Sequence, residues 1–261
     1  MIGALFVDPV ERLGRATLGC VTALGRFGVF FAQALFWLVI PPFKLEQTLH
    51  RISFIGFRSL SVILLTGAFT GMVLGLQGVI LLRRVGSEAF VGAAVAVSLV
   101  RELGPVVSAL MVTGRAGSAL AAEIGVMRIT EQIDALTVMA LNPMRYLVVP
   151  TIVAGVVAMP LLGAIFDVVG IYGGYLVAVQ LFGLSGGTYF GQIQSFLTTT
   201  DIWVGFWKSL AFGVIITWVA CYKGFYVGHG AEGVGRATTE AVVLASVLIL
   251  VLDYFLGSVL P

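Results

Sequence analysis

Charged side chains are scarce in this sequence. Asp, Glu, Lys and Arg make up only 11% of its 261 residues, whereas about 25% is usual in soluble proteins, and 59% of the residues are hydrophobic. So few charges cannot cover a soluble globule of this size, which excludes a soluble enzyme or binding domain. The formal net charge of +2 is also too small for a nucleic-acid-binding surface, so no nucleic-acid partner is expected. The composition predicts an integral membrane protein.

Residues that commonly carry chemistry are also few. The two cysteines, Cys20 and Cys221, provide neither a disulfide framework nor a zinc site, and the two histidines, His50 and His229, are far apart in the sequence. No Gly-Lys-Ser/Thr sequence occurs, so the chain lacks the phosphate-binding loop of a conventional ATPase. We therefore expect no catalytic residues, no metal and no cofactor.

Long apolar runs are what the sequence does contain. A bilayer-crossing helix needs about 20 apolar residues. Five segments meet this length, and the predicted fold is an all-α membrane protein with five transmembrane helices. The five segments are residues 60–82, 89–112, 147–182, 202–222 and 241–260.

The N-terminal region differs from these segments. The apolar run at residues 27–40 would be about 21 Å long as a helix, too short to cross, and Pro41 and Pro42 follow it. Arg12, Arg15 and Arg26 precede this run and suit the cytoplasmic surface of a membrane. Residues 1–54 are therefore predicted to form an amphipathic interfacial helix region, and residues 55–261 a single five-span domain.

The distribution of lysine and arginine predicts the orientation. Eleven of these residues fall in the N-terminal region and in the segments after the second and fourth spans, whereas only Arg83 and Arg84 fall on the opposite side. Because basic residues accumulate on the cytoplasmic side, the N-terminus is predicted to be cytoplasmic and the C-terminus to lie on the other side of the membrane.

Small residues recur every four positions in and after the first two spans. Such rows let helix backbones approach closely inside a bilayer. We expect them to mark helix contacts. The rows are Gly67/Gly71/Gly75, Gly114/Ser118/Ala122 and Gly117/Ala121/Gly125.

Arg101 and Glu102 lie in the middle of the second span. Charges at that depth cost between about 3 and 10 kcal/mol and usually face a cavity or a partner. Pro105 has no N–H, which leaves the carbonyl of Arg101 without its usual helical donor. Two interpretations remain open. The pair forms an interhelical bridge with Lys208, Asp253 or Asp167, or it lines a hydrated substrate cavity that can include such a bridge.

Residues 130–140 predict a short cytoplasmic helix between the second and third spans. Thr130 is the expected N-cap, and Glu131 and Asp134 are expected in the first turn, where acidic residues favour the helix dipole. Ile133, Leu136 and Ala140 would line one face, and Asn142-Pro143 would end the helix. The segment is either a plain connector or a handle for a cytoplasmic motor.

Several motifs together resemble the MlaE/YrbE permease family, the membrane subunits of ABC transporters that move phospholipid between Gram-negative membranes. The similarity extends from residue 56 to the C-terminus. The motifs are GMVLGLQG (residues 71–78), SLVRELGPVVSAL (98–110), GRAGSALAAEIGVMRITEQIDAL (114–136), ALNPMRYLVVP (140–150) and GVGRATTEAVV (233–243).

The resemblance implies a homodimer in the bacterial inner membrane with a lipid pocket at the dimer axis, serving outer-membrane lipid asymmetry. It implies four partners: an ABC ATPase subunit, a small STAS-domain subunit, a periplasmic MCE-domain ring and a phospholipid. The C-terminus would then be periplasmic. The pocket residues implied are Arg101, Glu102, Leu74, Leu81, Leu82, Lys208 and Arg236. The residues implied in coupling to the ATPase are Glu131, Gln132, Asp134 and Leu136.

An alternative function is a stand-alone secondary transporter of an amphiphile in which Glu102 carries a proton. It predicts uptake that a pH gradient drives without any ATPase. An intramembrane lipid enzyme is a further alternative, but the sequence lacks a catalytic set at one depth.

Overall fold

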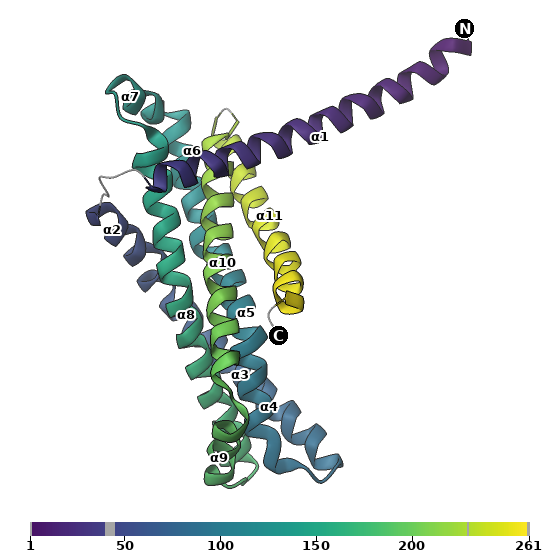
Figure 1. Ribbon diagram of the computed structural model, residues 1–261, viewed down its shortest axis with the longest axis vertical. Coiled ribbons are helices and arrows are strands. Elements are labelled where there is room, and N and C mark those ends of the chain that lie inside the picture. The colour runs from purple at the N-terminus through teal and green to yellow at the C-terminus, as the bar shows by residue number, and fades with distance from the viewer. Residues whose placement is uncertain (1, 40–44, 229, 260–261) are drawn as a thin grey trace.

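The computed structural model describes residues 2–39, 45–228 and 230–259, and in this part of the chain it is helical without a strand (Figure 1). This confirms the predicted all-α class. The α-helices are α1 (Ile2–Val39), α2 (Leu45–Ile55), α3 (Leu60–Arg84), α4 (Val91–Ser98), α5 (Gly104–Val112), α6 (Ser118–Ile129), α7 (Gln132–Val138), α8 (Val149–Tyr175), α9 (Gly186–Phe196), α10 (Thr199–Phe225) and α11 (Gly230–Val259).

Short 3-10 and π-helical segments join several of these helices. The 3-10 segments are η1 (Phe57–Ser59) and η2 (Glu88–Phe90). The π-helical segments are η3 (Leu99–Leu103), η4 (Thr113–Gly117), η5 (Met144–Val148) and η6 (Leu176–Leu181).

The five predicted spans are present as long helices. Six helical stretches among the described residues are long and apolar enough to cross a membrane, and five of them overlap the five predicted spans. The second is longer than expected, since helical structure runs from Glu88 to Ile129 through α4, α5 and α6. α10 and α11 likewise begin before their apolar runs. The ends of apolar runs thus underestimate the length of the helices.

The sixth stretch, Thr17–Leu38, corrects the length predicted for the N-terminal helix. It has 22 residues, so by length and composition it could cross a membrane, and the argument that it is too short is wrong. α1 is a continuous 38-residue helix, and the apolar residues Leu18, Val21 and Leu24 precede Arg26 in it, so the run counted from residue 27 was too short. Figure 1 shows α1 running across the upper end of the bundle rather than along it. Its interfacial position stays a prediction, and Pro41 and Pro42 lie outside the described residues.

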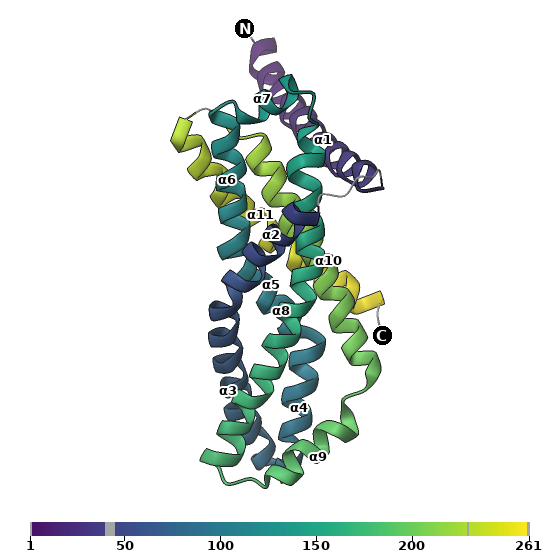
Figure 2. The same cartoon turned by 90° about the vertical axis from the view of Figure 1, so that its left-hand side faces the viewer.

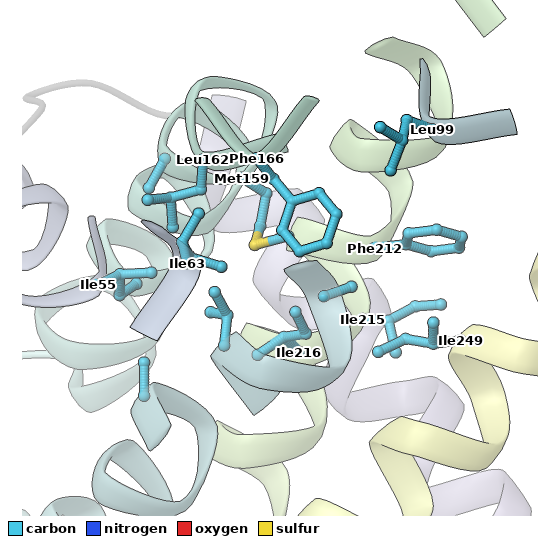
Figure 3. Packing of buried hydrophobic residues seen from close by; sticks show 14 of the residues in the cluster. Ile55, Ile63, Leu99, Met159, Leu162, Phe166, Phe212, Ile215, Ile216 and Ile249 are labelled. Atoms are coloured by element: carbon cyan, nitrogen blue, oxygen red, sulfur yellow. The ribbon is translucent and has the colours of Figure 1, made fainter. Parts of the chain in front are cut away.

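The core of the bundle forms where α3, α8 and α10 pack together (Figure 3). Gly71 of α3 faces Gly170 of α8 so closely that a Cβ at position 71 would overlap the Gly170 carbonyl group. One turn on, a Cβ at position 75 would lie 2.9 Å from Gly174. The first predicted row therefore marks a helix contact with backbone on both sides.

The rows after the second span behave differently from each other. Gly117 and Gly125 contact side chains of α10 and α11, as expected of a packing row. Gly114 is exposed, and a Cβ at this position would have no neighbour within 4 Å, so Gly114 marks no helix contact within the described chain, whereas Ser118 and Ala122 of the same row are half-buried. At the opposite end of the molecule from α7, α9 packs against α4 and closes the bundle (Figure 2).

The predicted helix at residues 130–140 is shorter than expected. α7 covers Gln132–Val138, and Thr130 is not its N-cap, because the Thr130 hydroxyl donates to the carbonyl of Val126 in the last turn of α6. Glu131 occupies the N-cap position with a left-handed φ of 59°. Asp134 is in the first turn, as predicted.

The end of this helix also differs from the prediction. The helix ends at Val138, and Ala140 has a φ of 60° and lies outside it. Asn142 does not end α7. Its side-chain oxygen accepts a hydrogen bond from the Met144 N–H at 2.9 Å, so Asn142 and Pro143 lead into the next long helix instead.

Candidate substrate site and coupling segment

The charged pair of the second span lies in a π-helical turn. In η3 the N–H of Gly104 donates to the carbonyl of Leu99, five residues earlier, and Pro105 follows with no donor of its own. Such a turn changes the direction of the side chains relative to a regular helix. Arg101 and Glu102 consequently reach two different partners on α10.

Glu102 belongs to a cluster of three charges on three helices. Lys208 of α10 is completely buried, and its ammonium donates to Glu102 at 2.5 Å and contacts Asp253 of α11 at 2.9 Å. A buried ammonium group needs a counter-charge, because burial of an isolated charge is expensive. Here two carboxylates surround one cation, so the cluster holds a formal charge of −1.

Arg101 pairs with a residue that was not among the sequence candidates. Its guanidinium donates to Asp201 at 3.2 Å. Asp201 is positioned at the start of α10 by a capping box with Thr198, in which each side chain bonds the backbone N–H of the other. The Thr-x-x-Asp pattern before an apolar run was the available signal for this residue.

The structure decides between the three partners considered for the mid-membrane charges. Lys208 is bonded to Glu102, and Asp253 joins through Lys208. Asp167 of α8 does not join the cluster. One of its oxygens is buried without a hydrogen-bond partner among the described residues, and it lies against the backbone of Gly104.

The cluster is nevertheless open to the outside of the single chain. The side chain of Glu102 is 46% exposed and that of Arg101 is 34% exposed, although their partners on α10 are almost fully buried. The geometry therefore combines the two interpretations of the sequence. Interhelical ion pairs exist, and the side chains of Arg101 and Glu102 are also accessible from outside the single chain.

The apolar residues implied by the family resemblance lie on α3. Leu81 is 61% exposed and points away from the core, while Leu74 and Leu82 are half-buried and pack against it. An exposed leucine on a membrane helix is available to a lipid chain or to another subunit.

Arg236 lies far from the other implied pocket residues. It is exposed near the start of α11 and lines a cavity with Lys223 of α10. Lys223 is 15 residues beyond Lys208 on the same helix, a separation of about 22 Å along the axis. A single chain thus does not bring Arg236 together with Arg101 and Glu102.

The segment implied in coupling protrudes at the upper end of the bundle (Figure 1). Glu131, Gln132 and Asp134 are exposed there, and Asp134 accepts a hydrogen bond from Arg128 at 2.6 Å. Leu136 is 8% exposed and, with Ile133, packs inside the chain, so it anchors α7 rather than presenting a surface.

The tip of this segment carries two apolar side chains that were not among the sequence candidates. Val138 is 88% exposed and Met139 is 61% exposed. Val138 is the last residue of α7 and Met139 is its C-cap, so both lie just beyond the buried Leu136. Exposed apolar side chains at a helix end, beside exposed acidic ones, form a surface suited to a protein partner.

Comparison with known proteins identifies the family to which these features belong. The chain matches the family described as Permease MlaE over residues 48–259. The chain belongs to the MlaE permease family. This confirms the resemblance seen in its sequence motifs and its assignment as a transporter subunit rather than an enzyme.

Individual relatives of this MlaE-family permease match it over nearly its whole length. It is 40% identical to the "Intermembrane phospholipid transport system permease protein MlaE" of Haemophilus influenzae, over 98% of each chain. It is 42% identical to a "Probable ABC transporter permease protein" of Rickettsia bellii, over 97% of each. It is also 37% identical to the chloroplastic protein TRIGALACTOSYLDIACYLGLYCEROL 1 of Arabidopsis thaliana, over 82% of this chain and 61% of that protein.

Proposed function

We propose that this chain is the permease subunit of an ABC transporter that moves phospholipid between the inner membrane and a periplasmic MCE-domain protein, and so maintains the lipid asymmetry of the outer membrane. The observation that carries the proposal is the charged cluster around Lys208, whose outer member Glu102 is partly exposed, together with the neighbouring Arg101, which is also partly exposed. The full-length similarity to a permease named for intermembrane phospholipid transport supports it.

The site suits an amphiphile. The guanidinium of Arg101 is a planar donor for a phosphate headgroup, and Asp201 holds it in place. Leu74, Leu81 and Leu82 offer an apolar surface for the acyl chains. Glu102 and Asp253 keep Lys208 charged and fixed, so that the headgroup meets an ordered polar surface.

A homodimer completes this site. The exposed charges of one chain need a cover in the bilayer, since a charge facing lipid is costly. A second copy related by a two-fold axis would place the same cluster opposite, which is the simplest closed arrangement. Native mass spectrometry of the purified protein tests this directly, and a single copy of the chain per complex would contradict it.

The exposed α7 tip supports coupling to a cytoplasmic ATPase. Glu131, Gln132 and Asp134 offer polar contacts, and Val138 offers an apolar one. The motor must be a separate subunit because this sequence has no phosphate-binding loop. A small STAS-domain subunit on the same side and an MCE ring on the periplasmic side would complete the complex in the inner membrane, with the N-terminus cytoplasmic and the C-terminus periplasmic.

Reconstitution tests the proposal. The complete complex is placed in liposomes with a labelled phospholipid, and transfer to the soluble MCE-domain protein is followed after ATP is added. We expect transfer that requires ATP and stops with a hydrolysis-deficient ATPase subunit. Transfer by the permease alone, driven by a pH gradient and abolished by Glu102→Gln, would instead support the proton-coupled transporter.

A further inference from the structure

Two arginine side chains hold α2 beside the helix of the second span. Arg51 of α2 donates to Glu123 of α6 at 2.7 Å. Arg115, in the π-helical turn η4 that precedes α6, donates to the carbonyl of Phe54 at 2.8 Å and lies 5.2 Å from the centre of the Phe54 ring. The C-terminal half of α2 is thus fixed to the second span at two points.

The Arg51–Glu123 ion pair crosses a cavity rather than a packed interface. The cavity has a volume of about 660 Å³ and lies between α2, α6 and the start of α8, with His50 and Tyr146 also lining it. Within the described residues α2 packs chiefly against α8, and its backbone has few direct contacts with α6. An ion pair that bridges such a space is the main connection through which α6 can displace α2.

α6 connects this ion pair to the segment implied in coupling. α6 ends at Ile129 and α7 begins at Gln132, at the upper end of the bundle (Figure 2). Arg128, in the last turn of α6, donates to Asp134 of α7 at 2.6 Å, so an ion pair as well as a short turn fastens the two helices together. Glu123 lies on the same helix as Arg128, about 7.5 Å away along its axis. A movement of α7 therefore displaces Glu123.

In the other direction, α2 leads to the proposed substrate site. The chain passes from α2 through η1 into α3, the helix that carries the three leucines of that site. Hydrogen bonds continue across the junction, because the Gly56 N–H donates to the carbonyl of Ile52 at 2.7 Å and the Ser59 hydroxyl donates to that of Ile55 at 2.6 Å. A displacement of α2 is consequently passed on to α3.

We propose that the Arg51–Glu123 ion pair is the mechanical link that passes the movement of α7 to α2 and so to α3. Both are positioning residues, since neither lies in the substrate site. The proposal rests on the proposed function, because it takes α7 to be the contact with the ATPase. The two side chains are 14% and 42% exposed, and an ion pair with one half-exposed member adds little to folding stability. The role of the link can therefore be measured apart from folding.

The first measurement follows α2 directly and needs no lipid. His50, which is exposed beside Arg51, is replaced by cysteine in a chain that also carries Cys20→Ser and Cys221→Ala. Labelling by a charged maleimide is timed in the complete complex, without nucleotide and after trapping with ATP and vanadate. We expect the two rates to differ by about threefold or more. Glu123→Gln should abolish this difference while ATP hydrolysis stays within about twofold of the parent.

The second measurement is phospholipid transfer per ATP hydrolysed. Arg51→Gln and Glu123→Gln should each lower this ratio about tenfold, whereas Arg51→Lys, which keeps the charge, should leave it within about twofold. Glu240→Gln is the matched control and should change neither measurement. It breaks the Lys223–Glu240 pair, which has the same 2.7 Å length and a similar exposure but joins α10 to α11.

Folding is checked separately. Each variant should melt within about 2 °C of the wild type. If Glu123→Gln melts lower, the comparison of Arg51→Lys with Arg51→Gln decides, since only the first keeps a cation beside Glu123.

Three outcomes would overturn the proposal. Equal labelling rates in the two nucleotide states of the parent would show that the cavity keeps its shape. A difference that survives Glu123→Gln would show that another contact carries the movement. Equal losses in Glu123→Gln and Glu240→Gln would assign them to a general loosening of the bundle. Failure of the proposed function is seen separately, because the wild-type complex would then transfer no phospholipid while the labelling rates still decide on the link.

Discussion

Lys208→Met gives the sharpest test of the charged cluster. Lys208 is completely buried between two carboxylates, so its removal leaves Asp253 and Glu102 facing each other without a cation. Removal of one member of a buried ion pair typically costs about 3–5 kcal/mol. With about 2–4 °C of melting temperature per kcal/mol for a chain of this size class, we expect a fall of at least about 6 °C.

Glu102→Gln should behave very differently, although it breaks the same hydrogen-bonded pair. Lys208 keeps Asp253 at 2.9 Å, so no buried charge is left unpaired. The Glu102 side chain is 46% exposed, and a pair of that kind contributes under about 1 kcal/mol. This variant should therefore fold normally and lose phospholipid transfer, because it changes the outer surface of the proposed site.

The assay is a melting curve by fluorescence-detected size-exclusion chromatography in detergent. Lys223→Met is the matched control, since Lys223 lies on the same helix and pairs with Glu240 at 2.7 Å, but both side chains are partly exposed. It should melt within about 2 °C of the wild type. The double variant Lys208→Met, Asp253→Asn should recover part of the loss, because only the half-exposed Glu102 then remains charged.

The reasoning is refuted if Lys208→Met melts like Lys223→Met. That result would mean that water or lipid already compensates the charges of the cluster, and burial of Lys208 would no longer explain its pairing. An equal loss in Glu102→Gln and Lys208→Met would also refute it, because the two variants differ in whether a buried charge is left unpaired.

Three further predictions concern packing, coupling and capping. Gly71→Ala should lower stability by about 1–3 kcal/mol in detergent melts, because the new Cβ would meet the facing backbone of α8. Gly114→Ala, whose Cβ would meet nothing within 4 Å, should be neutral or slightly stabilising. Equal effects of the two substitutions would contradict the close contact between α3 and α8. Glu131→Lys should insert normally but co-purify at least tenfold less ATPase, and wild-type ATPase recovery would leave α7 as a plain connector. Asp201→Ala should cost about 1–2 kcal/mol, because it removes the carboxylate half of the α10 capping box and the partner of Arg101; an unchanged melting temperature would show that neither contact matters for folding.

The spans could be predicted from the sequence because each depends on a local property. About 20 consecutive apolar residues are enough to identify a membrane helix, and no knowledge of its neighbours is needed. The same rule gave the wrong length for α1, since the count began after Arg26 although the helix and its apolar residues Leu18, Val21 and Leu24 begin before it. Apolar length measures what a bilayer can hold, whereas helix length depends also on caps and on packing.

The partners of the mid-membrane charges depend on how helices are placed beside one another. Arg101 and Glu102 are recognisable from the sequence as costly, and Lys208 and Asp253 are among the candidate partners, but Asp201 is not. The Asp201 carboxylate bonds Thr198 within the local capping box and also accepts a hydrogen bond from the distant Arg101. Only the contact with Arg101 depends on how the helices are placed. The prediction that Thr130 is the N-cap of α7 is wrong for a similar reason. The Thr130 hydroxyl bonds the carbonyl of Val126 in the last turn of α6, so it does not cap α7.

Two ion pairs join α11 to α10. α11 is a sparsely buried candidate span, with 11% of its most apolar stretch buried against 67% for α10. Two lysines of α10 hold it through ion pairs near its two ends, Lys208 with Asp253 and Lys223 with Glu240.

These two attachments differ in strength, because the first lysine is fully buried and the second pair is partly exposed. The two ion pairs therefore contribute unequally to the position of α11. Loss of the buried pair would leave a charge unpaired, whereas the partly exposed pair adds little to the apolar packing of Val234, Ala237 and Ala241, which are buried in the first half of the helix.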